Sequence, residues 1–248
     1  MPQHALPVRS ARLGRPIGAR GPVHGVVLVL PGGGGPHSSR PLSRLSLLRA
    51  DALARRLVGG EEAGELLVAH VVRYRFRGWN GEEASPVTDA AWAADEVVRR
   101  YGDIPVCLAG FDSGARAALR AAGHPAVDSV LALGPRLPEA PEEPVRQLIG
   151  RRVLLAHGTD DRDTDPELSF RLAERAKKVN SEVCRFEVHT DRHALRHRRT
   201  EVLALAQDFV LGALCDRDFC RPLHDAFAAP PPLGLRMPLA AGFGRGPH

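Results

Sequence analysis

The sequence contains almost no lysine. Its 34 basic residues include only two lysines, Lys177 and Lys178, and the arginines are spread along the chain instead of forming one stripe. A nucleic-acid-binding surface needs clustered basic residues, so the formal net charge of +5 does not indicate one. We therefore expect no nucleic-acid partner.

Long hydrophobic segments are also absent. No apolar run approaches the roughly 20 residues that cross a bilayer, and the first residues, Met1 to His4, do not begin an apolar signal segment. The sequence therefore predicts no membrane association and a cytoplasmic location.

Cysteine is scarce, and none of the four cysteines is paired with another at the spacing of zinc ligands. The glycine run at residues 32–35 lacks the Lys-Ser/Thr pair that completes a phosphate-binding loop. We therefore predict no metal and no cofactor. The sequence defines no oligomeric state.

Short apolar segments alternate with helical segments from residue 23 to residue 215. The segments expected to be strands are residues 26–30, 66–72, 106–109, 127–133, 152–156 and 182–188. A helix is expected to open at Ser85 and Pro86, and its spacing of four and three predicts a buried face of Val87, Ala91, Ala94, Val98 and Tyr101. This alternation predicts one α/β domain, with a mostly parallel, doubly wound sheet and helices on both faces.

Two flanking segments differ in composition from this domain. Residues 1–22 are rich in Arg, Gly and Pro and are expected to add an edge strand or to stay loose. Residues 216–248 are rich in Pro and Gly, and we expect a mobile tail there. Local packing of Leu223, Phe227 and Leu233 is the alternative.

The most informative motif is Gly110-Phe111-Asp112-Ser113-Gly114, which follows an apolar strand and precedes a helix. This is the pattern of a nucleophile elbow, with aspartate where serine normally stands. Glycines are needed on both sides because side chains would clash in the tight turn. If Ser113 were the nucleophile, Phe111 and Ala115 would occupy the glycine positions, which disfavours that register.

The chain resembles the α/β-hydrolases from about residue 26 to residue 214. Besides the elbow, the resemblance rests on the acid motif His157-Gly158-Thr159-Asp160-Asp161, on His193 after the last strand, and on Pro31-Gly32-Gly33 at the place of the oxyanion loop. The order nucleophile, acid, histidine is the order this fold uses. Residues 134–151 are too few for a sizeable cap, so a capless member is expected.

The resemblance implies a catalytic set of Asp112, Asp161 and His193, in which Asp161 orients the imidazole. It also implies an oxyanion hole formed by the backbone N–H groups of Ser113 and of Gly32 and Gly33.

Other polar residues near these motifs have a structural interpretation as well as a functional one. His157 is interpreted as a structural loop histidine, and Asp160 and Asp163 as solvated loop charges. His189 and His197 are alternatives to His193, which the family's spacing favours. His37 and Trp79 are weak candidates for the substrate pocket, since surface positions would explain them equally well.

An aspartate at the elbow changes the expected chemistry. It is already ionised at neutral pH, and its attack on saturated carbon bearing a halide or an epoxide oxygen gives an alkyl ester. The motif G-x-D-x-G resembles the elbows of haloalkane dehalogenases and epoxide hydrolases. The chain departs from them in lacking a cap, in having Ser113 where dehalogenases place tryptophan, and in having only Tyr74 and Tyr101 as tyrosines.

The sequence therefore predicts a hydrolase of a small organic molecule that acts through Asp112, with His193 and Asp161 activating water. Two alternatives remain. One is a cyclase, lyase or dehydratase of secondary metabolism that uses Asp112 and His193 as acid–base groups. The other is a non-catalytic binding module.

Overall fold

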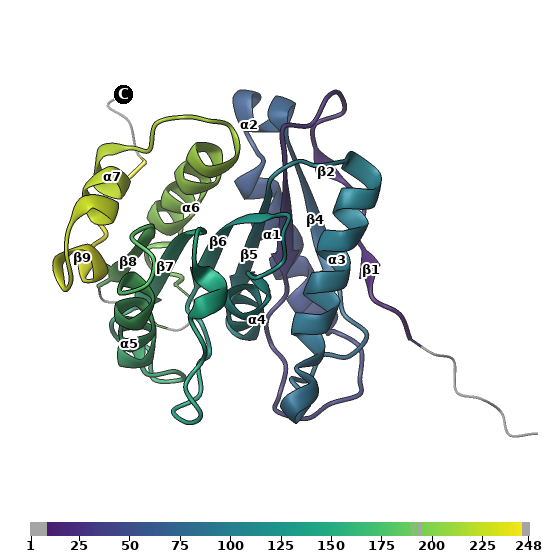
Figure 1. Cartoon of the computed structure of the whole chain (residues 1–248), viewed down its shortest axis with the longest axis horizontal. Helices are drawn as coiled ribbons and strands as arrows, with labels where there is room; N and C mark the ends of the chain where they lie inside the picture. The colour runs from purple at the N-terminus through teal and green to yellow at the C-terminus, as the bar shows by residue number, and fades with distance from the viewer. Residues whose placement is uncertain (1–8, 190, 193–194, 245–248) are drawn as a thin grey trace, which may run out of the picture.

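The structure is a computed structural model that describes residues 9–189, 191–192 and 195–244 (Figure 1). Its strands are β1 (Arg12–Leu13), β2 (Ile17–Gly18), β3 (Gly25–Leu30), β4 (Leu67–Arg73), β5 (Val106–Phe111), β6 (Val127–Leu133), β7 (Arg152–Gly158), β8 (Val183–Val188) and β9 (Met237–Pro238). Its α-helices are α1 (Arg44–Leu57), α2 (Glu61–Leu66), α3 (Ser85–Tyr101), α4 (Ser113–Ala121), α5 (Pro166–Lys177), α6 (Arg199–Leu214) and α7 (Arg221–Ala228). Short 3-10 turns are η1 (Gly81–Glu83), η2 (Arg146–Leu148) and η3 (Leu233–Leu235).

The strands form one sheet in the order β1-β4-β3-β5-β6-β7-β8-β9, with β2 also paired to β4. Neighbouring strands from β4 to β9 are parallel, whereas β1 and β2 run antiparallel to β4. All six residues of β3 are buried, which explains why this strand is a continuous apolar run instead of an alternating one. The predicted mostly parallel sheet is confirmed.

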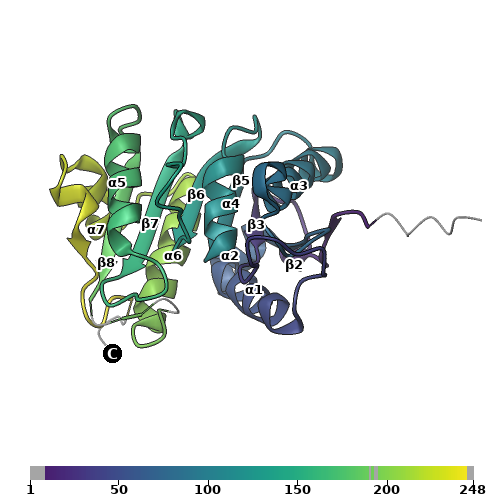
Figure 2. The same ribbon diagram turned by 90° about the horizontal axis from the view of Figure 1, so that it is seen from below.

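Helices cover both faces of the sheet (Figure 2). One apolar core lies between the sheet and α3, α4 and α5, and a second lies between the sheet and α1, α6 and α7. Among the helices of the described residues, none is both long and apolar enough to cross a bilayer.

Helix α3 begins at Ser85 as predicted, but its predicted buried face is only partly right. Ala94 is buried, whereas Val98 is 39% exposed. The fully buried positions of the helix body include Ala90, Ala93 and Val97 instead. Small alanines let α3 pack closely against its neighbours, so the buried stripe is rotated by about one residue from the one that valine spacing suggests.

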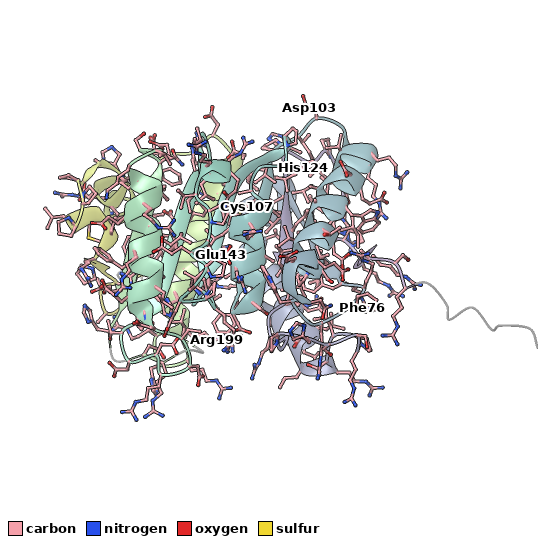
Figure 3. All side chains as sticks on the ribbon, turned by 60° about the horizontal axis from the view of Figure 1, so that its bottom comes forward. Phe76, Asp103, Cys107, His124, Glu143 and Arg199 are labelled. Carbon is pink, nitrogen blue, oxygen red and sulfur yellow. The ribbon has the colours of Figure 1, made fainter. Side chains whose placement is uncertain are left out.

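The carboxyl ends of the parallel strands meet at one edge of the sheet. Figure 3 shows Phe76, which follows β4, and Arg199, which begins α6, toward this edge. Asp103 and His124, which precede β5 and β6, lie at the opposite edge. In open α/β sheets, ligands bind beyond the carboxyl ends of the strands, so the loops at this edge are the place to examine for a site.

The N-terminal segment contributes edge strands where the structure describes it. Arg12 pairs with Arg73, and Ile17 pairs with Ala69, both on β4. Of the two expectations for residues 1–22, an edge strand or a loose segment, the edge strand is therefore correct for residues 12–13 and 17–18. Residues 1–8 lie outside the described part.

The segment after Cys215 corrects the expectation of a mobile tail. It forms α7, η3 and β9, and β9 pairs in parallel with β8. Leu223 and Leu235 are fully buried, and the ring of Phe227 lies 5.2 Å from that of Phe219 between centroids. Leu233 is 67% exposed. The segment is rich in proline and glycine, but a few apolar side chains fix it to the protein, with Leu223 in the second core and Leu235 in the first.

Replacing Leu223 with alanine is expected to lower the free energy of unfolding by about 2–5 kcal/mol, because it leaves a cavity in a packed core. Leu233→Ala is the matched control from the same segment and should change stability by less than about 0.5 kcal/mol. Urea unfolding monitored by circular dichroism measures both. Equal effects of the two substitutions would contradict the packing described for α7.

Candidate active site

Asp112 is the single residue that connects β5 to α4, and it lies at the carboxyl edge of the sheet. Its backbone has φ 58° and ψ −125°, a conformation that residues other than glycine rarely adopt, and the residue is 5% exposed. Its N–H donates to Leu133 O at 3.1 Å, and its C=O accepts from Arg136 N–H at 3.1 Å. Strain of this kind costs about 1–3 kcal/mol and persists only where the surroundings impose it.

The two glycines of the motif let the turn pack against its neighbours. A Cβ on Gly110 would lie 2.6 Å from Ala115 N, and a Cβ on Gly114 would lie 2.8 Å from Pro31 O. Both distances are impossible for real Cβ atoms, so glycine is required at both positions. Ser113, by contrast, is the first residue of α4 and not the vertex of the turn.

Among the described residues, Gly33 and Arg136 donate hydrogen bonds to the carboxylate of Asp112. Gly33 N–H donates to Oδ2 at 2.7 Å, and Arg136 Nε–H donates to Oδ1 at 2.6 Å. A Cβ on Gly32 would lie 2.9 Å from Asp112 Cβ, so the glycine loop is packed directly on the elbow. Gly34 N–H donates to Ser113 Oγ at 3.4 Å. The loop predicted to supply oxyanion donors thus directs one backbone N–H at the side chain of residue 112.

Asp161 is at the end of β7, in a buried network. Its Oδ1 accepts the N–H groups of Asp163 and Thr164 at 2.8 and 3.1 Å, and its Oδ2 accepts Thr164 Oγ1 at 2.8 Å. His157 Nε2 lies 3.0 Å from the same Oδ2, and its Nδ1 lies 2.9 Å from Ser169 Oγ. An ionised carboxylate only accepts, so His157 donates to Asp161. His157 thus fixes the side chain of Asp161. It is buried within β7 and is not the loop histidine that the sequence predicted, because the strand extends to Gly158.

His193 lies outside the described residues, so the structure does not place it relative to Asp112 or Asp161. The segment before it is fixed to the acid loop, because Asp160 N–H donates to Asp191 O at 3.0 Å. Asp191 is buried and accepts the N–H groups of Arg192 and Arg198, both at 2.9 Å. Strand β8 therefore leads into a loop at the carboxyl edge of the sheet, beside Asp161.

Both alternatives to His193 lie on this loop. His189 is exposed, and His197 has a side chain that is 68% exposed, with Nδ1 3.6 Å from Asp191 Oδ1. Asp160 and Asp163 are exposed, as expected for solvated loop charges.

Comparison with known proteins gives no family profile and no curated protein that matches this chain. Solved structures do match. Esterase PE8 aligns over 82% of this chain and 100% of its own, with a TM-score of 0.63 and 17% identity. Est1E from Butyrivibrio proteoclasticus, solved with ferulic acid, aligns over 83% and 95%, with a TM-score of 0.60 and 14% identity.

A third match is XC6422 from Xanthomonas campestris, described as a serine hydrolase without a lid. It aligns over 82% of this chain and 86% of its own, with a TM-score of 0.55 and 17% identity. The chain has the α/β-hydrolase fold. It is similar in architecture to lid-less members, and identities below 25% establish the fold and not the activity.

The two weak pocket candidates of this hydrolase fold lie in different surroundings. Trp79 is packed under Arg116, whose guanidinium carbon lies 3.6 Å from the centre of the indole ring. His37 is exposed, and its Cε1 lies 3.8 Å from the position of a Cβ on Gly81. Backbone hydrogen bonds such as Trp79 N–H to Gly35 O, at 3.1 Å, join the two loops that carry them.

Arg136 was missed in the sequence. The one available signal was its position in Gly134-Pro135-Arg136, directly after β6, since such positions face the carboxyl edge of the sheet. Glu143 was also missed. It is buried and forms ion pairs with Arg116 and Arg120, which fix the 134–151 segment against α4.

Cys107 and the metal-ligating residue types among the described residues are other groups to consider besides Asp112. Burial raises the pKa of the Cys107 thiol, on β5 below the elbow, to about 12, so the reactive thiolate does not form at neutral pH. Within the described residues, no group of three or more His, Cys, Asp or Glu side chains is placed to hold a metal ion.

Proposed function

We propose that this protein is a hydrolase that attacks a small organic electrophile with the carboxylate of Asp112. The observation that carries the proposal is the 2.7 Å hydrogen bond from Gly33 N–H to Asp112 Oδ2, at a residue kept in the strained elbow conformation. One carboxylate oxygen is held by a backbone donor, as the carbonyl oxygen of an ester intermediate must be. The other oxygen, Oδ1, is then the attacking atom.

The first step suits saturated carbon that carries a leaving group. Oδ1 forms a bond to that carbon, and the bond from carbon to halide or epoxide oxygen breaks with its electron pair on the leaving atom. The product is an alkyl ester of Asp112. Attack on a carboxylic ester would instead give a mixed anhydride, which is an unfavourable intermediate.

The second step returns the enzyme to its starting state. We assign activation of water to His193, with Asp161 holding the imidazole in the required orientation. Water attacks Cγ of Asp112, and the negative charge that develops on Oδ2 is stabilised by Gly33 N–H and Ser113 N–H. Collapse releases the alcohol, which takes the proton from the imidazolium, and leaves Asp112 with one oxygen from water.

The contact of Arg136 with Oδ1 supports a second candidate function. A carboxylate in an ion pair can serve as an acid–base or electrostatic group without forming a covalent bond. In that case Asp112 and His193 would act in a cyclase, lyase or dehydratase, which does not add water to its substrate through an ester.

A single-turnover reaction in H₂¹⁸O distinguishes the two candidates. With enzyme in excess over bromoacetate or styrene oxide, we expect ¹⁸O in the peptide that contains Asp112, and unlabelled oxygen in the product alcohol. Peptide mass analysis measures the label. Turnover without label in Asp112 would exclude the ester mechanism and leave the acid–base candidate.

A further inference from the structure

Within the described part of the chain, the charged side chain of Arg136 contacts Oδ1, the oxygen assigned to attack. It follows β6, and its side chain is 45% exposed, whereas the Asp112 side chain is 7% exposed. Of the two groups in this ion pair, the guanidinium is therefore the one that solvent and a ligand can reach.

Most of the hydrogen-bonding capacity of Arg136 is unused in the described part of the chain. Its side-chain hydrogen bond to the described residues is the one from Nε to Asp112 Oδ1, and a guanidinium carries five N–H donors. No described residue accepts a hydrogen bond from its two Nη atoms. These four donors form the planar edge that binds a carboxylate through two parallel hydrogen bonds.

The side chain of Arg116, on the helix α4 that follows the elbow, already has two protein partners. Arg116 lies over the indole of Trp79 and forms an ion pair with the buried carboxylate of Glu143, which is labelled in Figure 3. One face of its guanidinium is covered by the indole and its side chain is 21% exposed, against 45% for Arg136, so of these two guanidinium groups Arg136 is the more accessible to a ligand.

From this geometry we infer that the substrate carries an anionic group, of the carboxylate type, next to its electrophilic carbon, and that Arg136 binds it. The inference rests on the proposed covalent role of Asp112. A carboxylate that accepts from one Nη group is held by the same guanidinium as Oδ1, so the carbon next to it comes close to the attacking oxygen. Arg136 also offsets the repulsion between two anions that would otherwise keep such a substrate away from Asp112.

Bromoacetate and bromoacetamide are matched probes for this inference, because they differ only in the charge of the group beside the reacting carbon. We expect Arg136→Gln to lower kcat/KM for bromoacetate about 30-fold, the effect of one hydrogen-bonded ion pair, chiefly through a higher KM. The rate with bromoacetamide should change less than about threefold. Arg136→Lys should restore part of the loss, since it keeps the charge without the planar edge.

The control variant is Arg40→Gln, which removes an exposed arginine from a neighbouring loop and should leave both rates unchanged. Bromoacetate can also alkylate the partly buried cysteines Cys215 and Cys220, which releases bromide. The bromide released by the Asp112→Asn variant is therefore subtracted as background. If Arg136→Gln slows both probes equally, then charge recognition by Arg136 is overturned while the ester mechanism stands.

A binding measurement separates failure of the inference from failure of the proposed function. Saturation-transfer NMR compares propionate with propionamide, neither of which can react. Binding of propionate that is lost in Arg136→Gln supports anion recognition even if Asp112 never forms an ester. Equal binding of both compounds, or binding that is unchanged in Arg136→Gln, overturns it.

Discussion

Asp112→Asn is expected to abolish turnover while leaving the fold intact. An amide oxygen is not a nucleophile under these conditions, so the rate should fall on the order of 10⁴-fold or more, as it does when other enzymes lose a nucleophile. Asparagine tolerates positive φ better than most residues, and its carbonyl oxygen can still accept from Gly33 N–H. The lost ion pair with the half-exposed Arg136 contributes at most about 1 kcal/mol.

The controls for this substitution concern stability and chemical integrity. Peptide mass analysis must show that residue 112 remains an amide, because hydrolysis of the asparagine would regenerate aspartate. Asp112→Gly removes the carboxylate and also the backbone strain, so it should be inactive and about 1 kcal/mol more stable than the natural protein. Turnover that persists in both variants, with residue 112 verified, would falsify a covalent role for Asp112.

The parts of the fold that could be predicted from the sequence are those encoded locally. The strand before the elbow is predicted at residues 106–109 and found at Val106–Phe111, and α3 is expected to open at Ser85 and does so. Apolar runs bounded by glycine and proline identify buried strands whatever their neighbours in space. The orientation of α3 was less predictable, because its buried face consists mainly of small alanines together with Val97, while Val98 is exposed.

The parts that the sequence did not reveal depend on residues distant in the chain. Asp112 and Arg136 are 24 positions apart, and only the parallel pairing of β5 with β6 brings them together. The order of the C-terminal segment depends on Arg185, which is buried in β8 and donates from Nη1 to Leu235 O at 2.9 Å. Composition suggested a loose tail there, because it carries no information about such partners.

The sequence and the structure agree most closely at the elbow, where the motif itself requires the geometry. This agreement concerns position and not chemistry. The sequence indicates that residue 112 occupies the vertex, but the contacts of its two carboxylate oxygens decide which reactions are open to it. Among the described residues Gly33 and Arg136 make such contacts, and Arg136 could be identified only in three dimensions.

Gly114→Ala is expected to destabilise the protein by about 3 kcal/mol or more, which is the opposite sign from helix propensity. Gly114 lies in the first turn of α4, and replacing glycine by alanine in a helix normally stabilises it by about 0.5–1 kcal/mol. Here the added Cβ would lie 2.7 Å from Leu30 C and 2.8 Å from Pro31 O. Both are backbone atoms at the end of β3, so no side chain can rotate away and the elbow must separate from the glycine loop.

Gly64→Ala is the matched control, because Gly64 is also helical and its Cβ would meet Val58 O at an ordinary 3.5 Å. It should leave stability unchanged or slightly increased. Urea unfolding compares the two variants at the same temperature. Separation of the elbow from the loop also moves Gly33 N–H away from Asp112 Oδ2, so any Gly114→Ala protein that folds should lose activity as well. A stable and active Gly114→Ala variant would show that the elbow does not need the close approach to β3 described above.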